Sequence, residues 1–269
     1  MKGLGYARAK LDRARLRLHS TTRITRACVI GGTPMLVEVG NPRELSRMKA
    51  YIRKEPDTVE WINQYVQPGD VFYDIGANTG LYSILAAKRL EGSGKVYSFE
   101  PESQNYASLN RNVYLNGLSD SIVGLCVAVS DACTIDTFYV RGQLRAGEAI
   151  HQFRQAKDDF GRPFAPVHQQ GMFGITLDDL CYSYDLDFPS HIKVDVDGHE
   201  HAVVDGARRV LRDPRLQTVL LEITEKPDER DKIRSMFTEF QEAGFSMSKK
   251  VETVQGREAH NVIFTRTES

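Results

Sequence analysis

The stretch DVFYDIGANTG, residues 70–80, decides the fold class of this 269-residue chain. A turn ends at residue 70, and a short apolar strand is predicted at 71–75. A loop with glycines at positions 76 and 80 follows the strand. A helix is predicted to follow over 79–90. Glycines after a strand let a ligand approach the backbone, and the free amides at a helix start attract anions. The stretch therefore predicts an α/β domain with a ligand site at the end of its first strand.

The alternation of strands and helices extends along most of the chain. Further strands are predicted at 34–39, 95–99, 122–129, 134–140, 192–196, 218–223, 245–248 and 261–265. Further helices are predicted at 43–65 with a break near Pro56, and at 102–115, 177–182, 200–211 and 228–243. This order predicts a mostly parallel sheet with helices on both faces. Such sheets bind ligands beyond the carboxyl ends of their strands.

The composition, with 41% hydrophobic and 26% charged residues, is ordinary for a globular domain. No apolar run approaches the roughly 18 residues needed to span a bilayer, and the N-terminus lacks the apolar core of a secretory signal. The four cysteines include no CxxC pair. We therefore expect a cytoplasmic protein without disulfides or a zinc site.

Positive charge is concentrated near the N-terminus. Residues 1–28 contain eight lysines and arginines against Asp12 alone, a net charge of +7, and the rest of the chain carries −8. Small and apolar residues spaced by three and four predict a basic helix with a narrow apolar stripe. We divide the chain into a basic helical extension, 1–33, and a main domain, 34–269. The helix either docks on the domain or contacts an anionic membrane face or partner, and no nucleic-acid partner is expected.

The loop after the first strand differs from the motifs that bind nucleotide phosphates. With Gly76 first, the dinucleotide fingerprint needs glycines at the positions of Asn78 and Leu81. No P-loop lysine follows either. An acidic residue before G-x-x-x-G suits a zwitterionic amino-acid tail better than a pyrophosphate. Glu100 ends the next strand, 20 residues after the loop, where a carboxylate can accept both hydroxyls of a ribose.

Five motifs occur in the order typical of one family. They are DVFYDIGANTG at 70–80, FEP at 99–101, AVSD at 128–131, TLDDL at 176–180 and IKVDVDGHE at 192–200. In these motifs the chain resembles the FkbM-type methyltransferases. The resemblance implies a class I methyltransferase fold, a Rossmann-like α/β domain around a mostly parallel seven-stranded sheet. It also implies S-adenosylmethionine as cofactor and methyl transfer to oxygen, often on a sugar, polyketide or lipid-linked glycan.

The cofactor site is predicted from this resemblance and from the two loops. Glu100 would hold the ribose of the cofactor. Asp131 would accept from the amino group of the adenine, and the backbone amide of Ser130 would contact a ring nitrogen. The predicted cofactor-binding residues are Asp74, Gly76, Ala77, Asn78, Gly80, Glu100, Ser130 and Asp131.

The end of the fourth strand in the alternating pattern is the predicted chemical centre. Lys193, Asp195 and Asp197 face one side if that strand stays regular. Methyl transfer to a hydroxyl needs a group that takes its proton, and a carboxylate or an imidazole can do so. The predicted catalytic residues are Asp195, His199 and Glu200. Two plainer roles stay open, Glu200 as a charge at a helix N-terminus and His199 as a solvent-facing side chain.

A divalent metal is the alternative to a site made of protein groups alone. Asp195, Asp197 and Glu222, which ends the next strand, could together supply the hard oxygen ligands that Mg²⁺ prefers. Asp197 and His199 also depart from the family pattern, since they stand where relatives more often carry Glu and Ala.

The polar stretch 141–174 lies outside the resemblance, as do residues 1–60. It follows the third strand, close to the expected site, and carries a net charge of +2. A long insertion at such a place is predicted to be a lid or an acceptor-binding loop, and a disordered excursion is the alternative.

Together these features predict an S-adenosylmethionine-dependent O-methyltransferase acting on a hydroxyl of a sugar, glycan or related small-molecule acceptor. One rival is an NAD-dependent oxidoreductase, against which the missing GxGxxG fingerprint counts. The other is a non-catalytic module that binds S-adenosylmethionine. The intact acidic residues Asp74, Glu100 and Asp195 count against that reading.

Overall fold

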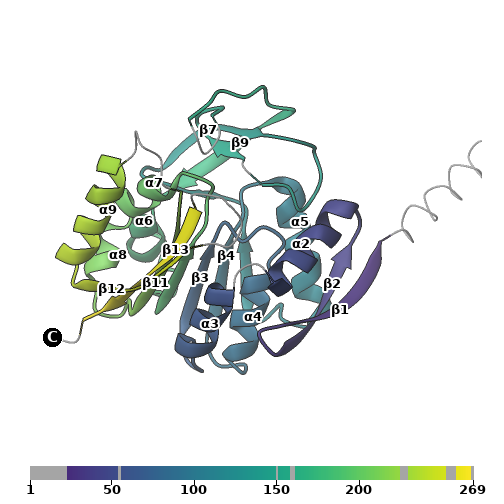
Figure 1. Cartoon of the computed structure of the whole chain (residues 1–269), viewed down its shortest axis with the longest axis horizontal. Helices are drawn as coiled ribbons and strands as arrows, with labels where there is room; N and C mark the ends of the chain where they lie inside the picture. The colour runs from purple at the N-terminus through teal and green to yellow at the C-terminus, as the bar shows by residue number, and fades with distance from the viewer. Residues whose placement is uncertain are drawn as a thin grey trace, which may run out of the picture.

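A seven-stranded sheet forms the centre of the molecule (Figure 1). The computed structural model describes residues 23–53, 56–149, 151–157, 161–224, 230–252 and 259–267. The strand order is β12-β13-β11-β10-β3-β4-β5, and the five strands from β11 to β5 run parallel. β13 runs antiparallel to both of its neighbours. The predicted mostly parallel, seven-stranded sheet is therefore confirmed.

The strands of this sheet have the following bounds. They are β3 (Val71–Ile75), β4 (Lys95–Phe99), β5 (Ile122–Leu125), β10 (His191–Val194), β11 (Thr218–Thr224), β12 (Phe245–Glu252) and β13 (Ala259–Arg266).

Helices cover both faces of the sheet, as predicted (Figure 1). Side chains alternate along β3, so Phe72 packs in one apolar core and Tyr73 and Ile75 in the other. The helices on the Phe72 face are α2 (Pro42–Arg53), α3 (Pro56–Tyr65), α4 (Leu81–Arg89) and α5 (Ser103–Leu115). Those on the other face are α6 (Leu177–Tyr182), α7 (Glu200–Asp205), α8 (Arg208–Arg212) and α9 (Arg230–Glu242).

The chain leaves the central sheet earlier than predicted. Residues 122–129 form two strands rather than one, because β5 ends at Leu125 and β6 (Ala128–Val129) belongs to a second sheet. This second sheet has the order β6-β9-β7-β8. Its other strands are β7 (Thr134–Val140), β8 (Gln152–Phe153) and β9 (His168–Ile175). Within the described residues, the stretch 141–174 is thus built partly of paired strands and is not a disordered excursion.

Two further predicted elements are shorter in the structure. The helix predicted at 200–211 is divided into α7 and α8. The chain bends between them at Gly206, where a Cβ would lie 2.1 Å from the carbonyl oxygen of Ser130. β10 ends at Val194 rather than at 196. Both changes affect the loops that surround the site.

A hairpin precedes the helices, with strands β1 (Ile24–Ile30) and β2 (Thr33–Val39). It packs on α5, where the amide of Glu38 donates to Oδ1 of Asn112 at 2.8 Å. Both strands contribute apolar side chains to the core. The predicted boundary after residue 33 therefore falls within one packed hairpin, and residues 24–28 are strand rather than basic helix. The helix predicted for the preceding residues, 1–22, lies outside the described part of the chain.

None of the helices in the described part of the chain is long and apolar enough to cross a membrane. Cys28, Cys126, Cys133 and Cys181 are all free thiols.

Candidate active site

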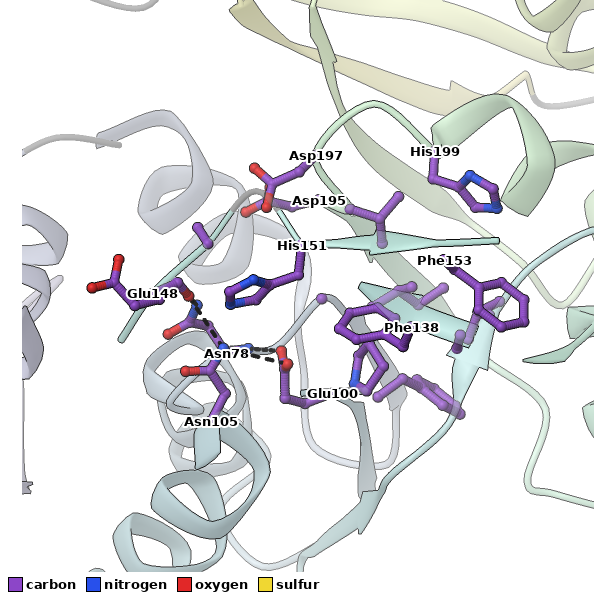
Figure 2. A pocket seen from close by; sticks show the side chains of 18 of the residues that line it. Asn78, Glu100, Asn105, Phe138, Glu148, His151, Phe153, Asp195, Asp197 and His199 are labelled. Atoms are coloured by element: carbon purple, nitrogen blue, oxygen red, sulfur yellow. Dashed lines mark hydrogen bonds between the residues drawn. The ribbon is translucent and has the colours of Figure 1, made fainter. Parts of the chain in front are cut away.

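A pocket lies where the predicted site was expected, beyond the carboxyl ends of β3, β4 and β10. Ile75 and Phe99, the last residues of β3 and β4, form its floor. Phe138 and Phe153 of the second sheet form an opposing apolar wall (Figure 2). The pocket therefore lies between the two sheets.

The glycine loop after β3 brings two strand ends into contact. Gly76 has a φ of +78°, and a Cβ there would lie 1.8 Å from the carbonyl oxygen of Asp195. Gly76 also lines the pocket. Gly80 instead faces α5, where a Cβ would lie 2.9 Å from the Leu109 side chain. Gly80 and the buried Ala77 of the same loop are not among the lining residues. They therefore support the conformation of the loop without facing the pocket.

Glu100 connects the first two loops and lines the pocket. Its carboxylate accepts hydrogen bonds from the amides of Asn78 at 2.7 Å and Glu102 at 2.9 Å (Figure 2). Asn105 Nδ2 lies 3.4 Å from the same carboxylate. Burial raises the pKa of Glu100 to about 7, against the effect of these hydrogen bonds.

Asp74 lies beneath the pocket rather than in its wall. Its carboxylate accepts from Ser83 Oγ at 2.6 Å and lies 3.4 Å from Nζ of Lys193. Lys193 is only 2% exposed, and its Nζ also lies 3.3 Å from Oδ2 of Asp195. The buried ammonium thus links Asp74 to Asp195 and fixes the latter at the pocket.

Asp195 lines the pocket. Burial raises its pKa, but the charge of Lys193, a side-chain hydrogen bond with Glu222 and the charge of Arg47 together have the larger effect. The pKa of Asp195 therefore lies below its usual value, and the carboxylate is ionised at neutral pH.

The residues after Asp195 do not continue the strand. Asp197 has a φ of +54°, so the expected alternation of side chains stops at the end of β10. Asp197 and His199 nevertheless both line the pocket (Figure 2). His199 Nε2 lies 3.1 Å from Ser130 Oγ. Burial lowers the pKa of His199 to about 4, so its imidazole is neutral at neutral pH.

Glu200 has the plainer of its two predicted roles. It is absent from the pocket lining, and its carboxylate accepts from the amides of Gly198 at 3.1 Å and Val196 at 3.3 Å. It therefore holds the loop that carries Asp195 and His199. Its placement does not support the predicted direct role in catalysis.

The structure places Ser130 and Asp131, the predicted adenine contacts, outside the pocket wall. The amide of Ser130 donates to the carbonyl of Ile175 at 2.8 Å, which joins β6 to β9. Asp131 forms an ion pair with Arg154 at 2.5 Å. Neither residue lines the pocket. The wall at this place is apolar instead, and Val127, Ala128 and Val129 form it.

Residues 74–247 match the model of a family described as the methyltransferase FkbM domain. The match covers more than half of the chain. The chain belongs to this family. It is therefore a methyltransferase, as its motifs indicated, and the oxidoreductase alternative is set aside.

Individual relatives are distant from this FkbM methyltransferase. Hexuronic acid methyltransferase AglP of Haloferax volcanii is 22% identical over 219 residues, which cover 74% of this chain and 78% of AglP. Fibrillarin of Aeropyrum pernix, solved with bound S-adenosyl-L-methionine, has a TM-score of 0.50 and 12% identity over 90% of this chain and 82% of its own. An FkbM methyltransferase of Methylobacillus flagellatus has a TM-score of 0.49 and 11% identity over 83% and 53%. The likeness to fibrillarin shows a shared class I methyltransferase fold.

Several pocket residues of this methyltransferase carry no sequence motif. Arg47 and Tyr51 come from α2, before the start of the family match. Asn105 comes from α5, and Glu148 and His151 come from the stretch 141–174. No local pattern distinguishes these residues from surface residues of the same type. Only the packing of distant segments brings them to one cavity.

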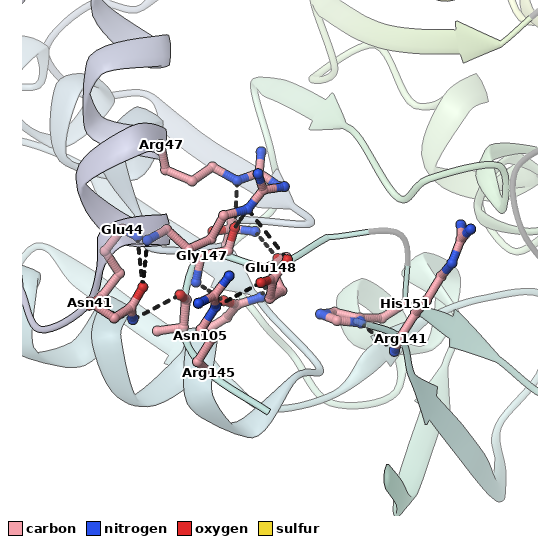
Figure 3. A network of polar contacts seen from close by, with 12 residues as sticks. Asn41, Glu44, Arg47, Asn105, Arg141, Arg145, Gly147, Glu148 and His151 are labelled. Atoms are coloured by element: carbon pink, nitrogen blue, oxygen red, sulfur yellow. Dashed lines mark hydrogen bonds and ion pairs between the residues drawn. The ribbon is translucent and has the colours of Figure 1, made fainter. Parts of the chain in front are cut away.

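Glu148 organises the edge of the pocket next to α2 (Figure 3). Its carboxylate pairs with Arg145 at 2.8 Å and Arg43 at 3.4 Å. Its carbonyl oxygen accepts from Nδ2 of Asn78 at 2.9 Å and of Asn105 at 3.2 Å. The stretch 141–174 is thereby attached to the loop after β3.

Among the described residues, no group of three or more His, Cys, Asp or Glu side chains is arranged to hold a metal ion. The proposed set of Asp195, Asp197 and Glu222 is not such a group in the structure.

The buried His151 predicts a specific pH dependence of stability. Burial lowers its pKa to about 4, whereas an unfolded histidine titrates near 6.5. As the pH falls through this interval, the unfolded chain takes up a proton at His151 that the folded chain does not. The free energy of unfolding should therefore fall by up to about 3 kcal/mol between pH 6.5 and 4 through this residue. Urea unfolding at a series of pH values measures the loss.

The variant His151→Phe should lose less stability than the wild type over this interval. His168 is exposed, so His168→Phe should keep the wild-type slope. Equal slopes for wild type and His151→Phe would contradict the burial of a neutral imidazole.

Proposed function

We propose that this protein is an S-adenosylmethionine-dependent O-methyltransferase acting on a hydroxyl of a sugar, glycan or related small-molecule acceptor. The observation that carries the proposal is the position of Asp195. Its ionised carboxylate lies in one pocket with Gly76 and Glu100, which belong to the predicted cofactor loops. Membership of the FkbM family supports methyl transfer, and the distant likeness to a hexuronic acid methyltransferase supports a sugar acceptor.

The pocket residues fit S-adenosylmethionine in polarity. Oδ1 of Asn78 is buried without a hydrogen-bond partner, so it can accept from the α-ammonium group of the cofactor. Glu100 presents a carboxylate for ribose hydroxyls. The apolar wall of Val127, Phe138 and Phe153 suits an adenine ring. When bound, the cofactor supplies an electrophilic methyl group.

Asp195 is the group proposed to handle the proton of the acceptor. An ionised carboxylate accepts a hydrogen bond from the hydroxyl, orients its oxygen and takes the proton as the oxygen attacks. The lowered pKa makes Asp195 a weak base, so orientation of the hydroxyl is its main contribution. His199, neutral and bonded to Ser130, supports the same loop and the polarity of this wall.

A methyl-transfer assay tests the proposal. The purified chain is incubated with isotopically labelled S-adenosylmethionine and a panel of hexuronic acids, neutral hexoses and oligosaccharides that contain them. Mass spectrometry should find the label on an oxygen of one acceptor class. Label on nitrogen, or no binding of S-adenosylhomocysteine in calorimetry, would contradict the proposal.

Replacing Glu100 with alanine is expected to weaken S-adenosylhomocysteine binding by roughly 1.5–3 kcal/mol, because a charged hydrogen-bond partner of the ribose is lost. Calorimetry at about pH 8.5, above the raised pKa of Glu100, measures the change. The matched control is Glu102→Ala, since Glu102 is equally buried and caps α5 through the amide of Asn105 but does not line the pocket. Equal affinities of the two variants would place the ribose elsewhere.

The stretch 141–174 is proposed to cover the pocket, as a lid or an acceptor-binding wall. Glu148, His151 and Phe153 all line the cavity, which supports this role. Contact of the basic residues 1–28 with an anionic membrane stays a prediction, as does the cytoplasmic location.

A further inference from the structure

Two buried polar atoms of opposite kind lack partners in the same pocket. They are the acceptor Oδ1 of Asn78 and Nε2 of His151. Asn78 is 9% exposed and His151 is 8% exposed. Leaving such atoms unpaired in a folded protein is unfavourable, and functional sites are where ligands satisfy them.

The orientation of both side chains follows from their other hydrogen bonds. Nδ2 of Asn78 donates to the carbonyl of Glu148, so its Oδ1 must be the free atom. Nδ1 of His151 accepts from the amide of Arg141 at 3.1 Å, which places the proton of the neutral ring on Nε2. Figure 2 shows both side chains among those that line the pocket. The pocket thus presents one unpaired acceptor and one unpaired donor.

Charged side chains of both signs act on His151. Besides burial, the negative charge of Glu148 raises the pKa of His151, and the positive charge of Arg47 lowers it to a smaller extent. Nε of Arg47 donates to the carbonyl of Gly147 at 2.8 Å (Figure 3). The nearby carboxylate of Glu148 is already paired with Arg43 and Arg145. A negatively charged ligand group next to His151 would therefore meet the N–H donor of the ring, while the two arginine partners of Glu148 offset the charge of that carboxylate.

We propose that His151 binds the α-carboxylate of the amino-acid tail of the cofactor through Nε2–H, while Asn78 accepts from the α-ammonium group. This assignment rests on the proposed use of S-adenosylmethionine. The stretch 141–174, proposed above to cover the pocket, would then also contribute to cofactor binding, because its residue His151 completes the cofactor site. A donor–acceptor pair of this kind matches the carboxylate and the ammonium group of a zwitterion. The edge of the adenine also carries a donor and an acceptor, and the ligand series below distinguishes the two because all three ligands keep the adenine.

Calorimetric binding of three ligands tests the proposal without turnover. S-Adenosylhomocysteine carries the complete tail, its decarboxylated analogue lacks only the carboxylate, and 5′-methylthioadenosine lacks both charged groups. His151→Phe removes the donor and keeps an aromatic ring. This variant should bind S-adenosylhomocysteine roughly 10- to 100-fold more weakly than the wild type, because a hydrogen bond to a charged group is lost. It should bind the other two ligands as the wild type does.

A second variant, His151→Gln, keeps an N–H donor of similar reach and should bind S-adenosylhomocysteine nearly as well as the wild type. Unchanged binding of 5′-methylthioadenosine by His151→Phe shows that the pocket is intact. Equal affinity of His151→Phe and wild type for S-adenosylhomocysteine would overturn the assignment and would place the free donor against the acceptor instead. Equal weakening for all three ligands would overturn it too. If the wild type binds no S-adenosylhomocysteine, the proposed function itself is wrong.

Discussion

Replacing Asp195 with asparagine is expected to lower kcat by roughly 10²- to 10⁴-fold, because the variant loses the carboxylate that orients the acceptor hydroxyl and takes its proton. Asparagine has nearly the same shape as aspartate, and its side-chain oxygen can still accept a hydrogen bond from Lys193. The variant therefore keeps a hydrogen bond in place of the buried ion pair at 3.3 Å. What is lost is the negative charge that orients and deprotonates the acceptor hydroxyl. Affinity for S-adenosylhomocysteine should stay within a few-fold of the wild type. Turnover at saturating cofactor and acceptor, together with calorimetry, measures both quantities.

The matched control for this variant is Asp197→Asn, which removes a carboxylate from the same pocket wall. Its loss of turnover should be smaller, because this variant keeps the carboxylate of Asp195 and the Lys193 contact that holds it in place. The pH dependence of kcat gives an independent check. The pKa of Asp195 lies below its usual value and that of His199 is about 4, so both groups are already deprotonated above about pH 5. Neither group should therefore change its protonation state near neutral pH. A folded Asp195→Asn variant with near-wild-type turnover would exclude Asp195 as the reacting group.

Replacing Gly76 with alanine is expected to destabilise the protein by more than about 3 kcal/mol and to abolish cofactor binding. The φ of +78° is unfavourable for a residue with a Cβ, and that Cβ would lie 1.8 Å from the carbonyl oxygen of Asp195. Relief of this overlap requires the loop after β3 and the end of β10 to separate. Urea unfolding and S-adenosylhomocysteine calorimetry measure the two effects.

Gly92→Ala separates backbone strain from steric overlap. Gly92 has a similar φ of +83°, but a Cβ there would meet nothing within 4 Å. This variant should lose only about 1–2 kcal/mol and should bind the cofactor normally. If Gly76→Ala were no less stable than Gly92→Ala, the close approach of the loop to Asp195 would be refuted.

The sequence alone determined the central sheet, the family and the position of the pocket. Strands such as Lys95–Phe99 were predicted with their true bounds, because a short, mostly apolar run between turn residues is typical of a strand covered on both faces. The order of such strands determines where their carboxyl ends meet. For this reason Gly76, Asn78, Glu100, Asp195 and His199 were predicted, and the structure places all of them in the pocket wall.

Only the tertiary structure decided which polar groups remain available to a ligand. Ser130 and Glu200 have the residue types expected of site residues, yet the Ser130 amide and the Glu200 carboxylate are both used within the protein. His151 belongs to a stretch without readable periodicity, yet packing buries it beside the loop after β3. Periodicity along a chain records which face of an element is buried. The hydrogen-bond partner of a polar atom is instead set by segments that are distant in sequence, and no local pattern records their approach.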